Sequence, residues 1–366
     1  MVTRIMIMAG GTGGHVFPAL AVAQELQARG VEVIWMGTRR GIEAKVVPDA
    51  GISMEWVSVS GLRGKGIVSW LFAPFKLVSA LFQSFVIIMR CRPMAVLGMG
   101  GFVAGPGGLM TWILHKPLVI HEQNAIAGLT NRLLARIATK AMQAFPKALQ
   151  ERANPQLVGN PVREAIAALP APEVRFEKRT GALRLLVLGG SLGAQSLNQT
   201  IPAAMNIIPE AGRPEIWHQA GGRLIDEARE CYRSTDVDAR VEPFIDDMAE
   251  AYGWADLVLC RAGALTISEL SAAGVAALLV PYPYAVDDHQ AHNAAYLVDA
   301  GAALMVRQDE LSADKLASIW QGLYQQHDGA SGIRTHLLGM AVKGRELAKC
   351  DAAKQVADVC MEVAHA

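Results

Sequence analysis

Two glycine-rich turns, each directly after a short apolar run, constrain the fold of this chain more than any other feature. The first turn, GGTGGH at residues 10–15, follows an apolar run at 5–9, and the second, GGSLGA at 189–194, follows a run at 185–188. Each reads as a strand, a tight turn and a helix start, where backbone amides and about half a positive charge face an anion. The repeat predicts two nucleotide-fold domains with a phosphorylated ligand in the crevice between them.

Length and composition narrow the class of protein. A chain of 366 residues favours two domains, because single cores stop growing near about 250–300 residues. The zero net charge argues against nonspecific nucleic-acid binding, which needs a basic face. The five cysteines include no C-x-x-C pair, which fits a reducing compartment and gives no zinc signature. The apolar run at 5–9 is shorter than the roughly 7–15 residues of a signal-peptide core.

Strand-like runs alternate with helical stretches along both halves. This order predicts parallel sheets with helices on both faces. We expect the linker at residues 150–181, which contain four prolines and little apolar periodicity. Ligands bind beyond the carboxyl ends of parallel strands, so the two sheets are expected to share a cleft. The predicted strands are 5–9, 31–37, 54–59, 95–98, 118–121 and 141–145 in the first half, and 185–188, 215–219, 241–245, 257–260, 277–281 and 303–306 in the second.

The segment 67–89 is almost entirely apolar and nearly long enough to span a bilayer. Polar residues and Pro74 interrupt it, which disfavours a spanning helix. From Phe75 onward its apolar residues fall on one helical face. That face predicts either ordinary core packing or an interfacial helix on an anionic membrane, because aromatic and basic residues flank it.

His15 lies where the first helix is expected to begin. The turn does not fit the dinucleotide pattern G-x-G-x-x-G, because Val16 stands at the third glycine position, and the second strand ends in Arg39 and Arg40 rather than an acidic residue. A helix N-terminus disfavours imidazolium, so the ring should stay neutral and able to accept a proton. A capping or packing histidine is the alternative.

Two more motifs follow strands of the first half. Residues 98–108 hold more glycines than a turn requires. They predict a close approach to a phosphate or flat ligand, with close helix packing as the alternative. His121-Glu122-Gln123-Asn124 follows the next strand. Four polar groups are costly to bury without partners, so we expect contacts with a polyhydroxylated ligand, or else an exposed loop.

The second half offers two further candidates. Residues 260–269 repeat the strand, glycine and helix order. Glu269 lies near the start of that helix, where its carboxylate can accept both hydroxyls of a ribose. A solvated helix residue is the alternative. The acids and histidines of 287–292 match no H-E-x-x-H spacing. They predict a sugar-contacting loop and no metal site.

Together, eight ordered motifs resemble the MurG family of UDP-N-acetylglucosamine transferases over nearly the whole chain. Any one motif alone is weak, but the ordered set is specific. Three positions depart from the family pattern without touching the chemistry: Phe102 replaces a tyrosine of some members, Ala262 an expected serine and Ala125 a common glycine. The motifs are GGTGGH at 10–15, SGLRGKG at 60–66, GMGGF at 98–102, HEQN at 121–124, GNPVR at 159–163, GGSLGA at 189–194, FIDDM at 244–248 and GALTISE at 263–269.

The resemblance implies a GT-B fold, an α/β architecture of two Rossmann-like parallel-sheet domains facing a central cleft. It implies an acceptor and membrane-docking domain at 1–160, a UDP-GlcNAc-binding domain at 161–340, and a C-terminal helix at 341–366 able to pack back on the first domain. The implied reaction is inverting transfer of GlcNAc from UDP-GlcNAc to the 4-hydroxyl of MurNAc in undecaprenyl-linked lipid I, giving lipid II for peptidoglycan synthesis.

The resemblance also implies partners and a location. The partners are UDP-GlcNAc, lipid I, an anionic membrane surface and other cell-wall or division proteins, with no nucleic acid and no cofactor. The implied location is peripheral, on the cytoplasmic face of the bacterial inner membrane. The segment 67–89 then corresponds to the family's membrane-docking surface, with Trp70, Phe72, Phe75 and Lys76 as its candidate contacts.

The resemblance assigns roles to individual residues. In the donor site, the Ile245 backbone would meet uracil, Glu269 the ribose and Arg163 the nucleotide portion. The donor diphosphate would lie at a loop and a helix start, the sugar at two other loops, and the lipid diphosphate at the N-terminal glycines. The residues are Ser191, Ala264, Leu265, Thr266, Ile267 and Ser268 for the donor diphosphate; Thr12, Gly13, Gly14, Asn124 and Gln290 for the sugar; and Gly10, Gly11, Gly100 and Gly101 for the lipid diphosphate.

The implied chemistry is a single displacement, in which the acceptor hydroxyl attacks the anomeric carbon as UDP leaves. Fixed amide donors stabilise the charge that grows on the leaving diphosphate. His15 is the first candidate for the general base, and Glu122 is the second. Two other functions remain open: a UDP-GlcNAc 2-epimerase of the same two-domain fold, which needs no acceptor, and a membrane-docked nucleotide-sugar sensor.

Overall fold

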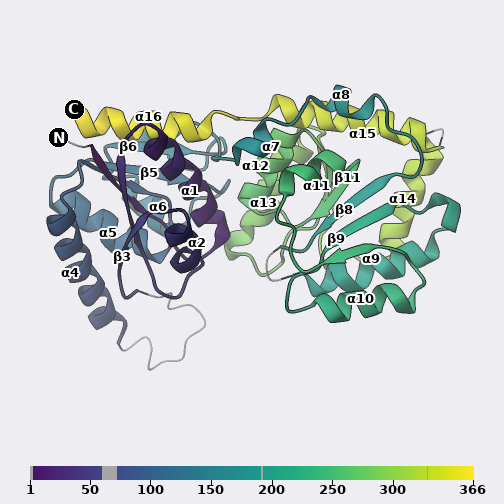
Figure 1. Cartoon of the computed structure of the whole chain (residues 1–366), viewed down its shortest axis with the longest axis horizontal. Coiled ribbons are helices and arrows are strands. Elements are labelled where there is room, and N and C mark those ends of the chain that lie inside the picture. The colour runs from purple at the N-terminus through teal and green to yellow at the C-terminus, as the bar shows by residue number, and fades with distance from the viewer. Residues whose placement is uncertain (1–2, 60–71, 191–192, 328) are drawn as a thin grey trace. The chain divides into compact units, whose positions relative to one another are not determined.

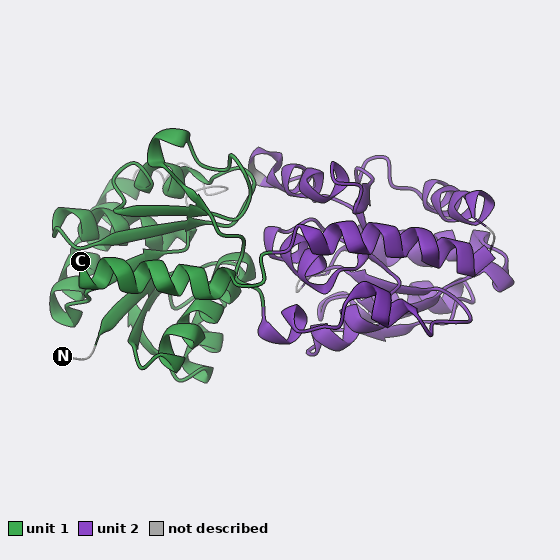
Figure 2. Cartoon of the chain, turned by 90° about the horizontal axis from the view of Figure 1, so that it is seen from above, with its two compact units in different colours: residues 1–162, 349–366 green, residues 163–348 purple. Residues whose placement is uncertain are grey.

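The computed structural model describes residues 3–59, 72–190, 193–327 and 329–366 of the chain (Figure 1). The chain forms two compact units, Met1–Val162 with Lys349–Ala366, and Arg163–Ala348 (Figure 2). The first crossing between them falls within 150–181, where we expected the linker. That stretch is regular in part, because it contains η1 (Glu151–Ala153), β7 (Gln156–Leu157), α7 (Glu164–Ala167) and α8 (Pro172–Phe176).

The first unit is built on a parallel sheet. Among its described residues the sheet has seven strands in the order β3-β2-β1-β4-β5-β6-β7. Six of them lie where the sequence predicts strands, and the seventh, β7, is a two-residue strand that no apolar pattern announces. The first six strands are β1 (Arg4–Met8), β2 (Glu32–Gly37), β3 (Ser53–Trp56), β4 (Ala95–Gly98), β5 (Leu118–Glu122) and β6 (Lys140–Gln143).

Helices cover both faces of this sheet, because both faces of its strands are apolar. Ile5 and Ile7 of β1 are buried in a cluster with residues of α1, α2 and α16. Met6 and Met8 point to the opposite face and are buried with residues of α4, α5 and α6. The chain therefore returns to this unit with its last helix, which packs against α1. The helices are α1 (Gly13–Ala28), α2 (Glu43–Asp49), α4 (Ala73–Cys91), α5 (Gly101–Ile113), α6 (Leu129–Leu134) and α16 (Ala352–His365).

The second unit repeats the plan. Its described residues form a parallel sheet of six strands in the order β10-β9-β8-β11-β12-β13. Leu185 and Val187 join one core cluster, and Leu186 and Val258, which point the other way, are also buried. The strands are β8 (Arg184–Leu188), β9 (Glu215–Gln219), β10 (Arg240–Glu242), β11 (Leu257–Cys260), β12 (Ala276–Leu279) and β13 (Ala303–Met305). The remaining elements are α9 (Gln195–Ile207), η2 (Glu210–Gly212), α10 (Ile225–Ser234), α11 (Met248–Trp254), α12 (Ala264–Ala273), η3 (Val286–Asp288), α13 (His289–Val298), α14 (Ala313–Gln326) and α15 (Gly329–Glu346).

A buried ion cluster ties three segments of the second unit together. Asp256, just before β11, is fully buried and forms ion pairs with Arg179 and Arg334. Its carboxylate also accepts a hydrogen bond from the Arg184 amide at 3.0 Å. Burial lowers the pKa of Arg179, and the charge of Asp256 opposes that shift. The cluster joins the segment before β8, the residue that precedes β11, and α15.

The strand order places the glycine-rich loops at the ligand-binding positions of this fold class. In each sheet the order reverses beside the first strand, between β1 and β4 and between β8 and β11. In open parallel sheets, ligands bind outside the carboxyl ends of the strands at such switch points. The loops after β1 and β4 in the first unit, and after β8 and β11 in the second, therefore lie at candidate ligand-binding positions.

Candidate functional site

The glycine turn after β1 is supported from behind by a buried carboxylate. The amide of Gly11 donates to Glu43 Oε2 at 3.0 Å. The other oxygen, Oε1, accepts from the Thr38 amide at 3.0 Å and the Thr38 hydroxyl at 2.7 Å. Glu43 is fully buried. In this conformation the Gly11 amide cannot also donate to the lipid diphosphate that we expected at Gly10 and Gly11. Sequence reasoning missed Glu43, because no motif contains it.

The glycines of the loop after β4 serve close packing. A Cβ on Gly101 would lie 2.3 Å from the Gly10 carbonyl oxygen, so the two glycine loops touch through their backbones. A Cβ on Gly107 would lie 2.3 Å from the sulfur of Met8, which lets α5 lie directly on β1. The packing alternative thus accounts for part of this glycine-rich run. Gly100 lies beside His15, since a Cβ on it would be 2.9 Å from two ring atoms.

The HEQN motif turns inward. His121, Glu122 and Gln123 are buried, so the alternative of an exposed loop is wrong for them. Glu122 Oε1 accepts from the Asn124 amide at 2.8 Å and side chain at 3.3 Å. Its Oε2 accepts from the Asn131 side chain at 3.0 Å and the Gly128 amide at 3.3 Å. Glu122 therefore anchors the loop after β5.

His15 is the half-buried member of the same group of side chains. It is the third residue of α1, and no side chain caps that helix at Thr12. Its Nδ1 lies 2.8 Å from Gln123 Oε1. The structure thus brings together His15, Gly100 and the HEQN segment, which the sequence places about a hundred residues apart.

In the second unit, Glu269 of α12 is the centre of a second polar cluster. The carboxyl is buried, and its Oε1 accepts from Arg163 Nη2 at 2.9 Å and Nε at 3.2 Å. Its Oε2 accepts from the Tyr252 hydroxyl at 3.1 Å. Burial raises the pKa of Glu269, while Arg163 and Tyr252 oppose the shift. Burial raises the pKa of Tyr252 well above its ordinary value, and the nearby charge of Glu269 makes a smaller contribution in the same direction. The alternative of a solvated helix residue is wrong, and sequence reasoning missed Tyr252.

The other predicted donor residues of this unit lie in the loop after β10 and at the starts of α12 and α13. The Ile245 amide donates to Gln219 Oε1 at 3.0 Å, and Gln290 Oε1 accepts from the Tyr282 amide at 2.9 Å. Ala264 to Glu269 form the first turns of α12, which begins after Gly263 without a side-chain cap. Ser191 falls outside the described residues, as does Trp70 of the candidate membrane surface.

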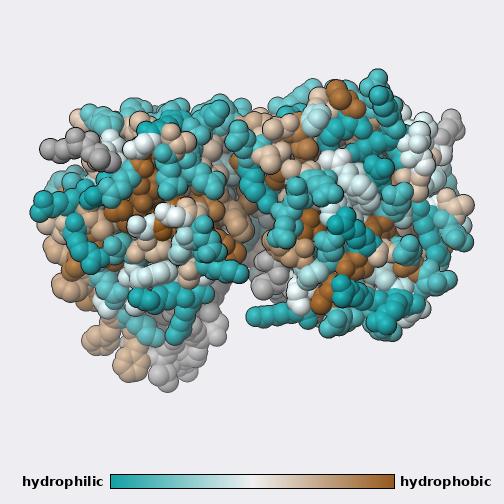
Figure 3. All heavy atoms as spheres, in the orientation of Figure 1, coloured by the Kyte–Doolittle hydropathy of each residue, from teal (hydrophilic) through white to brown (hydrophobic). Residues whose placement is uncertain are grey.

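Helix α4 exposes its phenylalanine and valine side chains and buries Ala80, Ser84, Ile87, Ile88 and Cys91. Phe75, Val78 and Phe82 are 74%, 65% and 66% exposed, whereas Ala80 and Ser84 are buried. Core packing therefore accounts for Ile88 but not for the exposed members of the stripe, which contribute to the apolar surface that Figure 3 shows on the first unit. Within the described part of the chain, α4 alone has the length and composition of a membrane-crossing helix, but its other side packs on α5.

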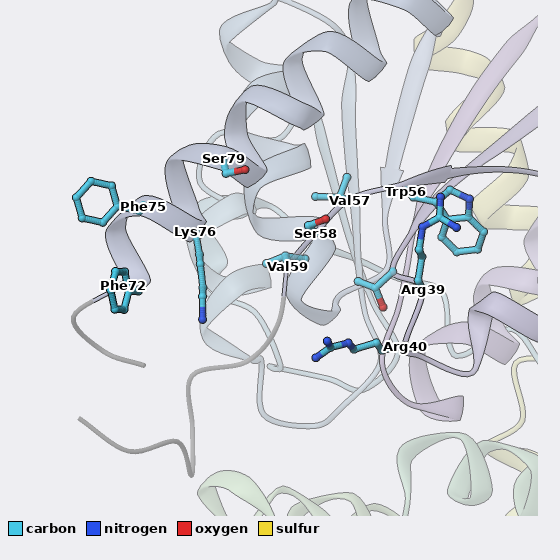
Figure 4. Close-up of a pocket in the computed structure, with 11 residues that line it drawn as sticks. Arg39, Arg40, Trp56, Val57, Ser58, Val59, Phe72, Phe75, Lys76 and Ser79 are labelled. Atoms are coloured by element: carbon cyan, nitrogen blue, oxygen red, sulfur yellow. The ribbon is translucent and has the colours of Figure 1, made fainter. Parts of the chain in front are cut away.

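A pocket of about 730 Å³ opens beside the start of α4. Figure 4 shows Lys76 of α4 together with Arg39 and Arg40 of the loop after β2. The Arg39 guanidinium stacks 5.1 Å from the ring centre of Trp56. Cations therefore border the exposed apolar side chains of α4. No group of three or more His, Cys, Asp or Glu side chains suited to a metal ion occurs in the described ranges.

Comparison with known proteins identifies the family. The model for the glycosyltransferase family 28 N-terminal domain matches residues 5–143, and that for the C-terminal domain matches 184–330. A relative from Nitrosococcus oceani is 54% identical over 100% of this chain and 99% of its own length. Its name is UDP-N-acetylglucosamine–N-acetylmuramyl-(pentapeptide) pyrophosphoryl-undecaprenol N-acetylglucosamine transferase.

Solved structures agree with this assignment. The crystal structure of Acinetobacter baumannii MurG matches with a TM-score of 0.84 and 39% identity, covering 98% of this chain and 99% of that chain. A crystal structure of a UDP-N-acetylglucosamine 2-epimerase matches with a TM-score of 0.65 at 12% identity, covering 100% of this chain and 98% of that chain, which is a likeness of fold alone. The predicted α/β GT-B fold class is confirmed. The chain belongs to glycosyltransferase family 28, and within that family to the MurG transferases.

Proposed function

We propose that this enzyme transfers GlcNAc from UDP-GlcNAc to the 4-hydroxyl of MurNAc in lipid I, with inversion at the anomeric carbon, and so makes lipid II for peptidoglycan synthesis. The observation that carries the proposal is the full-length identity of 54% to a relative whose name states this donor and this acceptor. The buried polar clusters around His15 and Glu269 support it, because each places polar groups next to the carboxyl ends of the strands of a parallel sheet.

In this proposal the second unit holds the donor. Glu269 accepts the ribose hydroxyls, and the amides at the start of α12 bind the diphosphate together with Ser191. The Ile245 amide is already bonded to Gln219, so the Ile245 carbonyl is the group that accepts uracil N3–H. Arg163 binds the nucleotide portion from its place beside Glu269. Gln290 contacts the sugar.

The first unit supplies groups for the donor sugar and for the acceptor. Asn124 and the turn of Thr12, Gly13 and Gly14 reach the sugar of the donor, and Gly10, Gly100 and Gly101 hold the lipid diphosphate. The acceptor hydroxyl gives its proton to His15 and attacks the anomeric carbon, while the bond to UDP breaks on the opposite face. Four hydrogen bonds from neighbouring groups occupy Glu122, which favours His15 over Glu122 as the general base.

A single assay tests the proposed reaction. UDP-GlcNAc is mixed with a soluble lipid I analogue, and UDP and the disaccharide are measured over time. We expect both products in equal amounts and only in the presence of the acceptor. Epimerised UDP-sugar formed without acceptor would instead indicate a 2-epimerase, and binding without UDP release would indicate a sensor.

Glu269→Gln is expected to weaken UDP-GlcNAc binding about 10–100-fold, because a hydrogen bond to a charged group is worth roughly 1.5–3 kcal/mol. Isothermal titration calorimetry measures the change, with exposed Glu250→Gln as the control. Burial raises the Glu269 pKa, so the carboxyl protonates at a higher pH than an ordinary glutamate. Affinity should therefore fall as pH is lowered through that raised pKa in the wild type, but not in Glu269→Gln. Equal affinities of the wild type and variant for UDP-GlcNAc would contradict the ribose role.

We further propose that the enzyme is peripheral on the cytoplasmic face of the inner membrane, with α4 as its docking element. Exposed Phe72, Phe75 and Phe82 enter the interface, and Lys76 faces anionic head groups. Apolar surface next to cations is the chemistry that binds such a membrane face. Cell-wall or division proteins are proposed as further partners of the docked enzyme.

The double variant Phe75→Ser with Phe82→Ser is expected to lower vesicle binding at least about 10-fold, since each buried phenylalanine contributes about 1.5–3 kcal/mol. Flotation with anionic vesicles measures the bound fraction. Phe244→Ser is the matched control, because Phe244 is 50% exposed but belongs to the second unit. Unchanged flotation of the double variant would refute docking through α4.

A further inference from the structure

A chain of hydrogen bonds connects the buried His121 to His15 through the side chain of Gln123. His121 Nε2 lies 2.8 Å from the Gly159 carbonyl oxygen. His121 Nδ1 lies 3.1 Å from Gln123 Nε2, and Gln123 Oε1 lies 2.8 Å from His15 Nδ1. Neither His121 nor Gln123 contacts substrate in the proposed reaction.

The proton on His121 can be placed by its partner. A carbonyl oxygen only accepts hydrogen bonds, so His121 Nε2 carries a proton and donates it to Gly159. Burial lowers the pKa of His121 to about 4, so the ring is neutral near pH 7 and has one N–H. Its Nδ1 therefore has a free lone pair and accepts from Gln123.

A second carbonyl fixes the orientation of the Gln123 amide independently. Gln123 Nε2 also lies 3.1 Å from the His121 carbonyl oxygen, and only the NH₂ end of an amide can donate to that oxygen. Nε2 thus faces the two His121 acceptors, and Met99 Sδ is a third, longer contact at 3.9 Å. The Oε1 end must then face His15.

An amide oxygen accepts, so the His15 nitrogen that faces it has to donate. We propose that His121 and Gln123 are positioning residues that hold His15 in the tautomer protonated at Nδ1, which leaves the Nε2 lone pair to take the acceptor proton. This inference rests on the proposed role of His15 as general base. The hydrogen bond that a histidine makes at one nitrogen decides which state the other adopts.

The pair of His121 and Gln123, here called the relay, is rigid, because both side chains are buried and hydrogen bonds hold both backbone carbonyls in place. The Asn131 side chain donates to the His121 carbonyl at 3.0 Å, and the Asn160 side chain donates to the Gln123 carbonyl at 3.0 Å. Both relay side chains are at most 1% exposed. Little orientational freedom is therefore left to Gln123, which presents Oε1 to His15 before substrate binds.

Nitrogen NMR of the ¹⁵N-histidine-labelled full chain reads the tautomer directly, without substrate. The His15 signals are those that disappear in His15→Ala. We expect Nδ1 of neutral His15 to be protonated and Nε2 to be unprotonated. The reverse assignment in the wild type overturns the inference. Because this readout needs no turnover, it tests the relay even if His15 proves not to be the base.

Gln123→Met removes the amide but keeps the length of the side chain. We expect kcat to fall about 10–100-fold, as when outer partners that orient a functional histidine are removed, with the KM for UDP-GlcNAc unchanged. Gln143→Met is the matched control, since Gln143 is also buried and ends the neighbouring strand β6. In a His15→Ala background, Gln123→Met should have no further effect on kcat. Full additivity of the two changes would overturn the inference.

Two variants of His121 distinguish a role in positioning His15 from a role in packing alone. His121→Asn and His121→Leu both lose the bond to Gly159, but only asparagine keeps an oxygen near the place of Nδ1 to accept from Gln123. We expect His121→Asn to keep a higher kcat than His121→Leu and to keep Nδ1 of His15 protonated. Equal kcat values with the same tautomer in both folded variants would refute a positioning role for His121.

Discussion

His15→Ala is expected to lower kcat about 10²–10⁴-fold, the usual contribution of a general base. The affinity for UDP-GlcNAc should change little, because the residues proposed to bind the nucleotide, around Glu269, belong to the second unit, whereas His15 belongs to the first. Steady-state kinetics with a lipid I analogue give kcat, and calorimetry with UDP-GlcNAc gives the donor affinity. In the wild type the Nε2 lone pair of His15 accepts the proton of the attacking hydroxyl. In His15→Ala the hydroxyl has to give that proton to water, which is a weaker base.

A second histidine variant controls for general effects of the substitution. His365→Ala removes an exposed histidine of the same unit, on α16, and should leave kcat unchanged. If kcat of His15→Ala stays within about twofold of the wild type, His15 only positions substrate and another group takes the proton. Glu122 would then be the next residue to replace.

Asp256→Asn is expected to destabilise the second unit by about 3–5 kcal/mol, the cost of breaking a buried ion pair by neutralising one partner. The variant leaves Arg179 and Arg334 beside each other, both buried and without their counter-charge. Hydrogen exchange measured by mass spectrometry localises the loss, since protection reports local opening free energies. Peptides from β8 and β11 should exchange faster, while peptides from β1 should not.

An exposed pair provides the comparison for this stability effect. Glu230→Gln breaks the ion pair with Arg233, whose two side chains are exposed on α10. Surface pairs contribute about 0–1 kcal/mol, so exchange in Glu230→Gln should match the wild type. Equal exchange in Asp256→Asn and Glu230→Gln would show that the buried cluster does not stabilise the unit.

The fold could be predicted from the sequence because its signals are local. Twelve apolar runs correspond to twelve of the strands, and the glycine-rich turns fall where each sheet reverses its order. Buried parallel strands need continuous apolar residues, and tight turns to helices need glycine, so both leave a pattern in the chain. Strand β7 left none, because its two residues are exposed and held by pairing with β6.

The candidate site was less predictable, because its contacts join residues far apart in the chain. Glu43 lies behind the Gly11 turn, and Tyr252 contacts Glu269 through the packing of α11 on α12. No spacing rule gives either contact. The sequence showed the HEQN motif but not the direction in which its side chains point. A polar run after a strand has the same sequence pattern whether its side chains face a ligand or form hydrogen bonds with one another. For α4, apolar periodicity predicted the stripe but could not say which of its residues are exposed: Val78 and Phe82 are exposed, whereas Ile88 is buried in the core.

The position of α16 has a consequence for how the protein is made. This helix contributes Val356 and Cys360 to the same core cluster as Ile5 and Ile7, although they lie at opposite ends of the chain. During synthesis, the second unit, Arg163–Ala348, has its whole sequence available before the first does. Until the residues of α16 have been synthesised, the sheet of the first unit cannot complete this core cluster, and part of its apolar face stays exposed to solvent. A truncation that removes α16 would therefore destabilise the first unit, although most of that unit is synthesised before the second.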